Sequence, residues 1–437
     1  MQESGLKKIM EREDIRIIAE MAAELGVDAY LVGGAMRDFL LRRETKDLDF
    51  VLSGAWEDLP RSFADRISGT FFWLDEKRLQ GRVVKKKGDG ISVYDFAPLC
   101  GNSIENDLRL RDFTINALAL PLIGDRMELI DPLHGCEDIR KGIIRACSAS
   151  AFDDDPLRLM RAIRFSAELG FAIEDNTWKT LGAKSALLKE VAWERVRDEL
   201  FRTLDAPGCG ASLKKLCSSG LWAEILAALE STICEESIAR AERAELLCLE
   251  VGCLFPESAE RLADYMDREI EAGISVCSLI KLAAILGSGE RGGTGPLAKR
   301  LRLGKAAERV LDLFCRDECE VYDLLERNSA ERVNYRFFRD REPAGLGMLI
   351  IARAAEAVSD DRFLSLMGYW LRQYEAEDAD LYLSGGEVMG ILGAEPGKVV
   401  GEAMARLRTA EGGGLVNSRE EAYQFIKNLL TSKASMR

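Results

Sequence analysis

Histidine is almost absent from this sequence: His134 is the only one among 437 residues. Histidine is the usual general base near neutral pH and the commonest metal ligand. Catalysis by histidine and metal sites with several histidines are therefore excluded. Any chemistry must depend on carboxylates, arginines and backbone groups. His134 itself lies in "DPLHG", a turn pattern, and we interpret it as structural.

Several other features are also missing. There is no apolar run of the ~20 residues that a bilayer requires. The N-terminus, "MQESGLKKIMERED", lacks the apolar stretch of a signal peptide. The 11 cysteines are scattered singly, which argues against a disulfide framework. A net charge of −14 argues against a protein that coats nucleic acid. We expect a soluble, cytoplasmic protein without a membrane partner; the sequence does not indicate its oligomeric state.

The pattern of apolar residues changes along the chain. The first part predicts a helix over 12–26, ended by Gly26, and five strands. The strands are expected at 28–32, 48–52, 69–74, 81–87 and 91–97, the last two joined by a "GDG" hairpin. Beyond Asp153 helical periodicity dominates. We predict an α+β fold with a mixed five-stranded catalytic head at 1–145, a helical neck at 146–205, a helical body at 206–300 and a helical, RNA-binding tail at 301–437.

Two glycines end the first predicted strand. Gly33 and Gly34 stand between "DAYLV" and a helix that begins in "AMRDFLL". A glycine turn at this position exposes backbone N–H groups to an anion. Arg37, one helical turn later, is placed to face the same anion. The alternative is a tight strand–helix turn with no ligand.

A close carboxylate pair begins the second predicted strand. Asp47 and Asp49 are two residues apart, so their side chains point to one face of the strand. Two carboxylates that converge need a compensating cation, and magnesium prefers carboxylate and phosphate oxygens. Asp95, on another predicted strand, supplies a third carboxylate for a two-metal nucleotidyl-transfer site. The alternative is a solvated strand face.

Five motifs in the same order resemble class II tRNA nucleotidyltransferases and bacterial poly(A) polymerases. They extend over Gly33–Leu204 and read "LVGGAMRDFLL…DLDFV", "LRLRDFTINALAL", "DPLHGCEDIRKGIIRA", "DDPLRLMRAIRFSAELGF" and "ERVRDELFRTL". The resemblance implies a polymerase-beta-like nucleotidyltransferase head. It also implies Mg²⁺ at Asp47 and Asp49, CTP and ATP as substrates, and a tRNA 3′ end as partner.

The second motif supplies further nucleotide-binding candidates. Arg111 beside the catalytic strands suits a triphosphate clamp. Asp112 is its neighbour, and Asn116 either bonds a ribose hydroxyl or caps a local turn.

The segment "DDPLRLMRAIRF" supplies the remaining candidates. Asp154 or Asp155 is expected to cap a helix that has Pro156 in its first turn. Arg158, Arg161 and Arg164 recur every three residues on one face of that helix. The resemblance implies that Asp155 and Arg158 read the nucleobase, while Arg161 and Arg164 position ribose and phosphates. Asp154 stands where many relatives have Glu.

Two departures from the family bear on specificity. The connector between Asp95 and "RDFT" has only 15 residues, whereas CCA-adding members usually carry a longer loop. This favours CC addition. A chain with one histidine also cannot form the HD phosphohydrolase domain of many relatives.

We therefore predict a metal-dependent, template-independent enzyme that builds the tRNA CCA end from CTP or ATP, or both, and releases pyrophosphate. The alternatives are a poly(A) polymerase, a small-molecule nucleotidyltransferase and an inactive RNA-binding protein on the same scaffold.

Overall fold

The computed structural model describes residues 9–45, 47–87, 90–124, 128–227, 234–287, 294–316, 319–327, 331–374, 381–412, 415–416 and 418–434. The chain divides into two compact units. The first comprises residues 1–191 with 218–221, and the second comprises 192–217 with 222–437. In the described part of the chain, no helix has the length and apolar character needed to cross a membrane.

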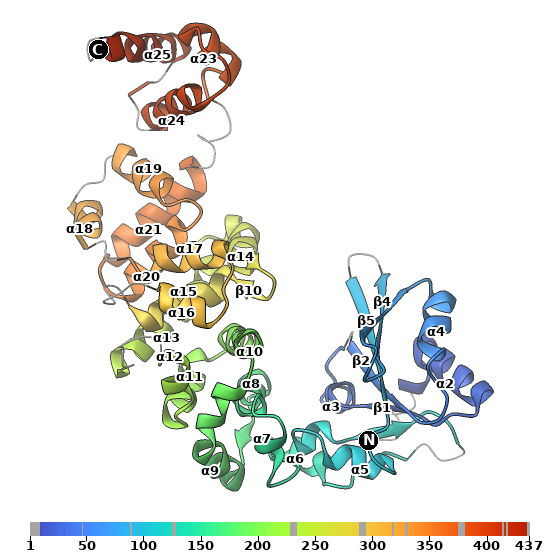
Figure 1. Cartoon of the computed structure of the whole chain (residues 1–437). Helices are drawn as coiled ribbons and strands as arrows, with labels where there is room; N and C mark the ends of the chain where they lie inside the picture. The colour runs from blue at the N-terminus through green and yellow to red at the C-terminus, as the bar shows by residue number, and fades with distance from the viewer. Residues whose placement is uncertain are drawn as a thin grey trace. The chain divides into compact units, whose positions relative to one another are not determined.

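The first unit is built on a mixed sheet (Figure 1). Within the described residues it has six strands in the order β3-β4-β5-β2-β1-β6. All pairs are antiparallel except β2 with β5. The strands are β1 Ala29–Val32, β2 Asp47–Leu52, β3 Thr70–Asp75, β4 Gln80–Lys87, β5 Gly90–Pro98 and β6 Ala119–Pro121.

The five predicted strands are confirmed, but the predicted number was wrong by one. The additional strand, β6, begins in the apolar segment 117–120, in which every residue is buried, and ends at the half-buried Pro121. Burial on both sides removes the alternation of apolar and polar residues that marks a half-buried strand. The predicted hairpin is supported by the pairing of Lys87 with Gly90, although its turn residues Gly88 and Asp89 lie outside the described residues.

Helices cover the two faces of this sheet differently. α2 (Glu13–Leu25), ended by Gly26 at φ 67° as predicted, lies with α4 (Leu59–Ile67) on one face (Figure 1). Phe63 of α4 packs edge-on against Phe96, which stacks on Phe50. On the other face α5 (Ile104–Arg109) packs Ile104 and Leu108 against strands β1 and β2. α3 (Gly34–Leu40) contacts the same two strands.

The rest of the first unit is mainly helical. It contains a two-stranded parallel sheet of β7 (Ile143–Ile144) and β8 (Ala172–Ile173). The remaining elements are η1 Thr114–Asn116, α6 Gly135–Lys141, α7 Ala151–Asp154, α8 Arg158–Leu169, α9 Asp175–Ala183 and η2 Ser185–Glu190.

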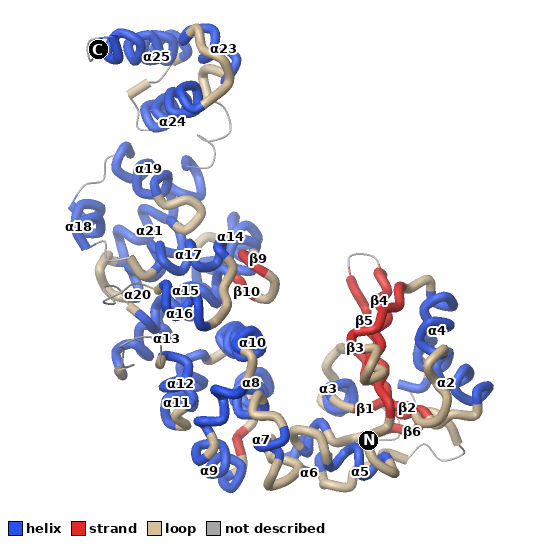
Figure 2. Tube along the Cα trace, in the orientation of Figure 1, coloured by secondary structure: helices blue, strands red, loops and turns tan. Residues whose placement is uncertain are grey.

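The second unit is almost entirely helical, as Figure 2 shows. Its only strands in the described residues are the short pair β9 (Glu269–Glu271) and β10 (Ile274–Ser275). The elements from residue 193 to 286 are α10 Trp193–Asp205, α11 Cys209–Ser218, α12 Leu221–Leu226, α13 Glu235–Leu254, η3 Pro256–Ser258, α14 Ala259–Asp267 and α15 Val276–Leu286. Those that follow are α16 Gly295–Arg300, α17 Lys305–Phe314, α18 Cys319–Arg327, α19 Glu331–Asp340, α20 Gly345–Ala354, α21 Asp360–Tyr369 and the π-helical turn η4 Trp370–Tyr374.

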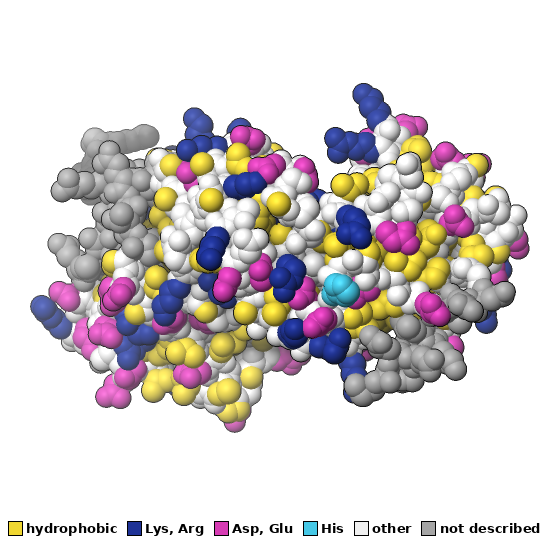
Figure 3. Space-filling model, turned by 90° about the horizontal axis from the view of Figure 1, so that it is seen from below, with side chains coloured by type: hydrophobic (Ala, Val, Ile, Leu, Met, Phe, Trp, Pro, Cys, Tyr) yellow, Lys and Arg dark blue, Asp and Glu magenta, His cyan; other side chains and the backbone are white. Residues whose placement is uncertain are grey.

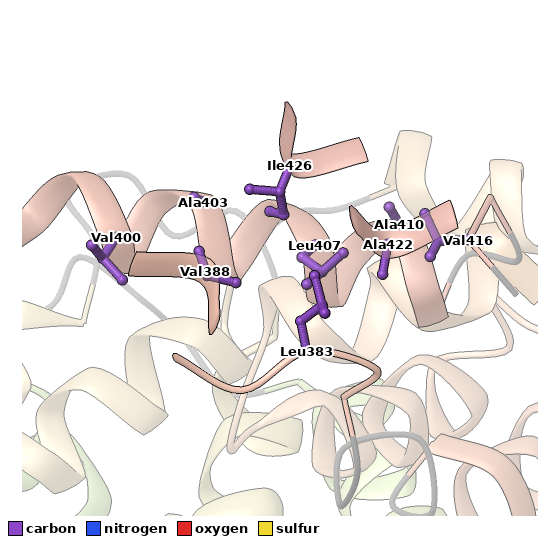
Figure 4. Packing of buried hydrophobic residues seen from close by; sticks show 9 residues of the cluster. All are labelled: Leu383, Val388, Val400, Ala403, Leu407, Ala410, Val416, Ala422 and Ile426. Carbon is purple, nitrogen blue, oxygen red and sulfur yellow. The ribbon is translucent and has the colours of Figure 1, made fainter. Parts of the chain in front are cut away.

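The last three helices share a small apolar core. They are α23 (Gly385–Leu392), α24 (Lys398–Gly412) and α25 (Arg419–Ala434). Val388, Leu407 and Ile426 meet at its centre (Figure 4). The α+β fold is thus confirmed, while the division into neck, body and tail remains a prediction. On the face drawn in Figure 3, basic and acidic side chains are interspersed, which agrees with the absence of a strongly basic composition.

Candidate active site

The predicted carboxylates lie on one face of the head sheet. Asp49 is paired with Asp95 across the parallel strands β2 and β5, and Asp47 precedes Asp49 by two residues. Residues opposite each other in neighbouring strands share a face, as do residues two apart in one strand. The structure therefore brings all three carboxylates to one side of the sheet.

Arg82 on β4 extends this row of carboxylates. It is opposite Asp95 in the antiparallel pair, and its Nε and Nη2 donate to the two carboxylate oxygens of Asp95, both at 2.7 Å. This bidentate ion pair raises the pKa of Arg82. Asp95 is thus held by its own sheet, and its catalytic role remains a prediction.

The electrostatic environment of Asp49 favours a cation. Burial, together with the neighbouring charges of Asp95 and Asp47, raises the pKa of Asp49 to about 6, although Arg111 opposes the shift. Among the described residues, no three acidic, cysteine or histidine side chains converge closely enough to hold an ion by themselves. Magnesium needs only one or two carboxylates when substrate phosphates complete its coordination. Asp47 and Asp49 therefore fit a magnesium ion that is shared with a nucleotide.

Gly33 lies between Asp49 and Arg111. Its backbone has φ 75° and ψ −144°, a conformation that only glycine adopts readily. A Cβ at this position would lie 3.1 Å from both Oδ2 of Asp49 and Nη1 of Arg111. Arg111 is oriented by Asp107, whose Oδ2 accepts hydrogen bonds of 3.2 and 3.1 Å from its Nε and Nη2. The turn, the carboxylate and the arginine thus form one compact group.

Arg37 is buried, and its role in facing an anion at the glycine turn remains a prediction. Its guanidinium lies over Gly34, as expected, since Nη2 would be 3.4 Å from a Cβ there. It donates through Nη1 to Oδ1 of Asn116 at 2.8 Å and through Nε and Nη2 to Asp38. Arg37 therefore joins α3 to η1.

A chain of hydrogen bonds continues from Asn116 to α8. Asn116 Nδ2 donates to Oδ1 of Asp112 at 3.0 Å, and Arg161 Nε and Nη2 donate to Oδ2 of Asp112 at 2.9 and 2.7 Å. Burial alone would raise the pKa of Asp112. The charge of Arg161 and the hydrogen bond from Asn116 outweigh that effect, so the pKa is lowered. Asp112 is therefore an ionised carboxylate that positions Arg161.

Phe165 of α8 is surrounded by arginines. The guanidinium carbons of Arg37, Arg161 and Arg164 lie 5.1, 5.0 and 4.1 Å from its ring centroid. Cations are attracted to the face of an aromatic ring. Arg164 also donates to Glu168 at 2.7 Å. The arginines of α8 thus have protein partners, and an anionic ligand is not required to separate them.

The segment expected to read the base precedes α8. Asp155 Oδ1 accepts from the backbone N–H of Leu157 at 3.2 Å in the turn before α8. The helix cap predicted at Asp154 or Asp155 was wrong, because α8 begins at Arg158, with Leu157 at its N-cap and no side-chain cap hydrogen bond. Arg158 donates to the carbonyl oxygens of Ala151 and Leu110. Asp154 ends α7 and accepts from the Ser150 hydroxyl at 3.1 Å. Asp155 and Arg158 are joined by a backbone hydrogen bond from Arg158 N–H to the Asp155 carbonyl oxygen at 3.0 Å; their reading of a base remains a prediction.

Comparison with known proteins places this site in a family. Residues 29–145 match the model described as "Poly A polymerase head domain", and residues 170–232 match "Probable RNA and SrmB- binding site of polymerase A". A CC-adding tRNA nucleotidyltransferase of Geobacter sulfurreducens is 41% identical over 422 residues, which is 96% of each chain. The chain belongs to the tRNA nucleotidyltransferase family.

Other tRNA nucleotidyltransferases are similar over nearly the same length. An A-adding tRNA nucleotidyltransferase of Deinococcus radiodurans is 30% identical, with 91% of this chain and 95% of that protein covered. A solved CCA-adding enzyme in complex with ATP superposes with a TM-score of 0.69 at 20% identity, covering 96% of this chain and 94% of that one. At that identity the superposition establishes the fold only.

Three residues of this nucleotidyltransferase site were missed in the sequence. Arg82 lies in "GRVVKKK", where its basic neighbours give it no distinctive signal; the predicted β4–β5 hairpin was the only indication that it could face Asp95. Asp107 lies four residues before Arg111, a spacing typical of a helical ion pair. Phe165 looks like any core residue of an amphipathic helix.

Proposed function

We propose that the protein is an RNA 3′-terminal nucleotidyltransferase that builds the tRNA CCA end from CTP or ATP, or both, with CC addition favoured. The observation that carries the proposal is the placement of Gly33 between Asp49 and Arg111. A carboxylate, a backbone turn without a side chain and a guanidinium that lie close together support a site for a cation and an anion. A nucleoside triphosphate with its metal ion has the matching chemistry.

The proposed reaction is an in-line displacement. The 3′-hydroxyl oxygen of the RNA attacks the α-phosphorus of the nucleotide, the bond to the bridging oxygen breaks, and pyrophosphate leaves. Asp47 and Asp49 would hold the magnesium ion, which would supply Lewis-acid stabilisation and lower the pKa of the 3′-hydroxyl. The proton of the 3′-hydroxyl is released to solvent water.

The protein groups act by position. Arg111, oriented by Asp107, offers its guanidinium to the phosphates, while Gly33 and Gly34 leave room for their approach. Arg37, Asp112, Asn116 and Arg161 form the hydrogen-bonded framework that joins this site to α8. Asp155 and Arg158, at the start of α8, are proposed to select the base, with Asp154 beside them; Arg164 supports the cluster around Phe165.

CC addition is supported by two observations. The connector after Asp95 is short, and a relative at 41% identity is a CC-adding enzyme. A-adding and CCA-adding relatives at lower identity show that nucleotide choice varies within the family.

The test is incorporation of CTP and ATP, supplied separately with Mg²⁺. The acceptors are tRNAs that end before the first C of the terminus, after it, and after the second C. We expect CTP to extend the first two acceptors up to CC and ATP to extend none. A-only extension of the CC-ended tRNA would overturn CC addition. Long A tails on unrelated RNA would identify a poly(A) polymerase, and no incorporation of either nucleotide would refute the enzymatic proposal.

A further inference from the structure

The row of residues that carries the catalytic carboxylates continues to the far edge of the sheet. In register, Asp49 is opposite Asp95, Asp95 is opposite Arg82, and Arg82 is opposite Phe72 on the edge strand β3. Because cross-strand partners share a face, Phe72 faces the same side of the sheet as Asp49. Three strand spacings of ~4.8 Å place the Cα of Phe72 about 14 Å from that of Asp49.

The opposite face of β3 is already occupied. Phe71 and Trp73 point to that face, where a Cβ on Gly81 would touch both rings, and Arg61 of α4 lies 5.1 Å from the Phe71 ring centroid. A core contact therefore explains Phe71 and Trp73, but it does not explain Phe72, which is 43% exposed.

Other side chains on the carboxylate face extend this surface. Ile91 of β5 is 51% exposed and is opposite Lys86 of β4, whose side chain is also exposed. Val84 and Val93 are opposite each other between this pair and the Arg82–Asp95 pair. The face that carries Asp47 and Asp49 thus also carries an exposed aromatic ring, apolar side chains and a lysine. These are Phe72, Val84, Val93, Ile91 and Lys86.

We infer that this surface, formed by Phe72, Val84, Lys86 and Ile91, binds the single-stranded 3′ end of the RNA, with Phe72 stacking on a base upstream of the reacting nucleotide. The inference rests on the proposed function. Unpaired bases stack on aromatic side chains in RNA-binding proteins, and lysines contact the backbone. The acidic surface near Asp47 is suited to the metal and the 3′-hydroxyl. The RNA phosphates that precede the 3′ nucleotide lie near Lys86 in this arrangement.

The surface around Phe72 adjoins the carboxylates Asp49 and Asp95, and this position indicates that it binds the RNA. An RNA 3′ end whose hydroxyl lies at Asp49 must leave the site across the sheet or away from it. α5 covers the face on the β1 side through Ile104 and Leu108, which pack with Val32 and Val51. The β5–β4–β3 side carries the exposed Phe72 and Ile91. Across the sheet, the exposed direction for the RNA leads to Phe72, to which we assign the role of a positioning residue that does not contact the reacting atoms.

The experiment measures RNA affinity without catalysis. Fluorescence anisotropy in EDTA compares the full chain with Phe72→Ala, Phe72→Trp and the control Leu25→Ala, whose side chain is 50% exposed at the end of α2. One RNA is a tRNA with its unpaired 3′ nucleotides, ending after the first C. The other is the same tRNA trimmed to a blunt acceptor stem. Thermal unfolding and CTP binding are measured for each variant.

We expect Phe72→Ala to weaken binding of the RNA with the unpaired end by about tenfold, because stacking on one base has that order of magnitude. Binding of the blunt RNA, the unfolding temperature and CTP affinity should stay unchanged. Phe72→Trp should restore affinity, and Leu25→Ala should have none of these effects. In the incorporation assay, Phe72→Ala should raise KM for tRNA and leave kcat nearly unchanged.

Equal affinity of Phe72→Ala and the unaltered chain for the unpaired RNA would overturn the inference. A change in sedimentation without a change in RNA affinity would assign the surface to a second copy of the chain and would also overturn it. Failure of this inference can be distinguished from failure of the proposed function. RNA affinity is measured without catalysis, so the effect of Phe72→Ala on binding can be determined even if the protein incorporates no nucleotide.

Discussion

Arg161 on α8 donates two hydrogen bonds to one carboxylate oxygen of Asp112, a residue 49 positions earlier in the chain. Asp112 is buried, so its negative charge depends on this partner and on Asn116. The ion pair links the helix proposed to select the base to the motif that carries Arg111. A substitution of Arg161 or Asp112 should therefore affect both the position of α8 and the position of Arg111.

Arg161→Ala should destabilise the protein by about 3–5 kcal/mol, because it leaves a buried carboxylate without its cation. Urea unfolding measures the loss. The control is Arg16→Ala, which removes an exposed i,i+4 pair with Glu20 and should cost less than ~0.5 kcal/mol. In Arg161→Ala/Asp112→Ala the two effects should not add, since both single changes break one pair. Additive effects would show that the two side chains stabilise the fold independently.

Asp47→Asn should lower the rate of nucleotide incorporation by roughly 10²–10³-fold, because a neutral amide binds a divalent cation poorly. Asp47 is exposed at the start of β2, so the unfolding temperature should be unaffected. Asp65→Asn is a matched control, since Asp65 is exposed on α4, the helix that covers the opposite face of the sheet. Undiminished incorporation by Asp47→Asn would refute the proposed mechanism.

Asp49→Asn should stabilise the protein in EDTA in a pH-dependent way. The pKa of Asp49 is raised from 3.8 in the unfolded chain to about 6 in the folded one. Ionisation therefore opposes folding, and the penalty is absent below pH ~3.8, grows as the pH rises to about 6 and is then constant.

Asn carries no charge at any pH. The variant should accordingly exceed the unaltered protein by up to ~3 kcal/mol above pH 6 and match it near pH 4. Thermal unfolding measured from pH 4 to pH 8 tests this. A difference that does not change with pH would show that ionisation of the buried Asp49 carboxyl does not destabilise the fold.

Gly33→Ala should reduce incorporation by roughly 10²-fold, because its Cβ displaces the groups that align the phosphates. It should also cost about 1–3 kcal/mol through backbone strain. Gly26→Ala is the control: Gly26 has φ 67°, but no atom lies within 4 Å of its Cβ position. It should lose ~1 kcal/mol of stability and keep full activity. Comparable losses of activity in both variants would mean that strain, not the close approach to Asp49 and Arg111, is responsible.

Local periodicity made several features predictable. Asp47 and Asp49 share a face because side chains alternate along a strand, and Gly26 ends α2 because glycine adopts a left-handed conformation at low cost. The strand β6 was not predictable in this way, since Ala119 and Leu120 are both buried and its sequence shows no alternation of apolar and polar residues.

Pairing between distant segments was beyond the reach of local patterns. Arg82 and Phe72 are ordinary strand residues until the order β3-β4-β5-β2 aligns them with Asp95 and Asp49. The sequence places Arg37 one helical turn after Gly34, but no local pattern shows that Asn116, 79 residues away, accepts its hydrogen bond in the interior.

The amino-acid sequence by itself determined the chemistry available to this protein: carboxylates, arginines and a glycine turn, with histidine almost absent, in the motif order of tRNA nucleotidyltransferases. The tertiary structure decided which of these groups meet. Cross-strand register and helix packing place residues that are distant in sequence within hydrogen-bond range. Burial and neighbouring carboxylates raise the pKa of Asp49, whereas Arg161 and Asn116 outweigh burial and lower the pKa of Asp112. Neither register nor burial is encoded in any one segment, because each depends on partners supplied by the rest of the fold.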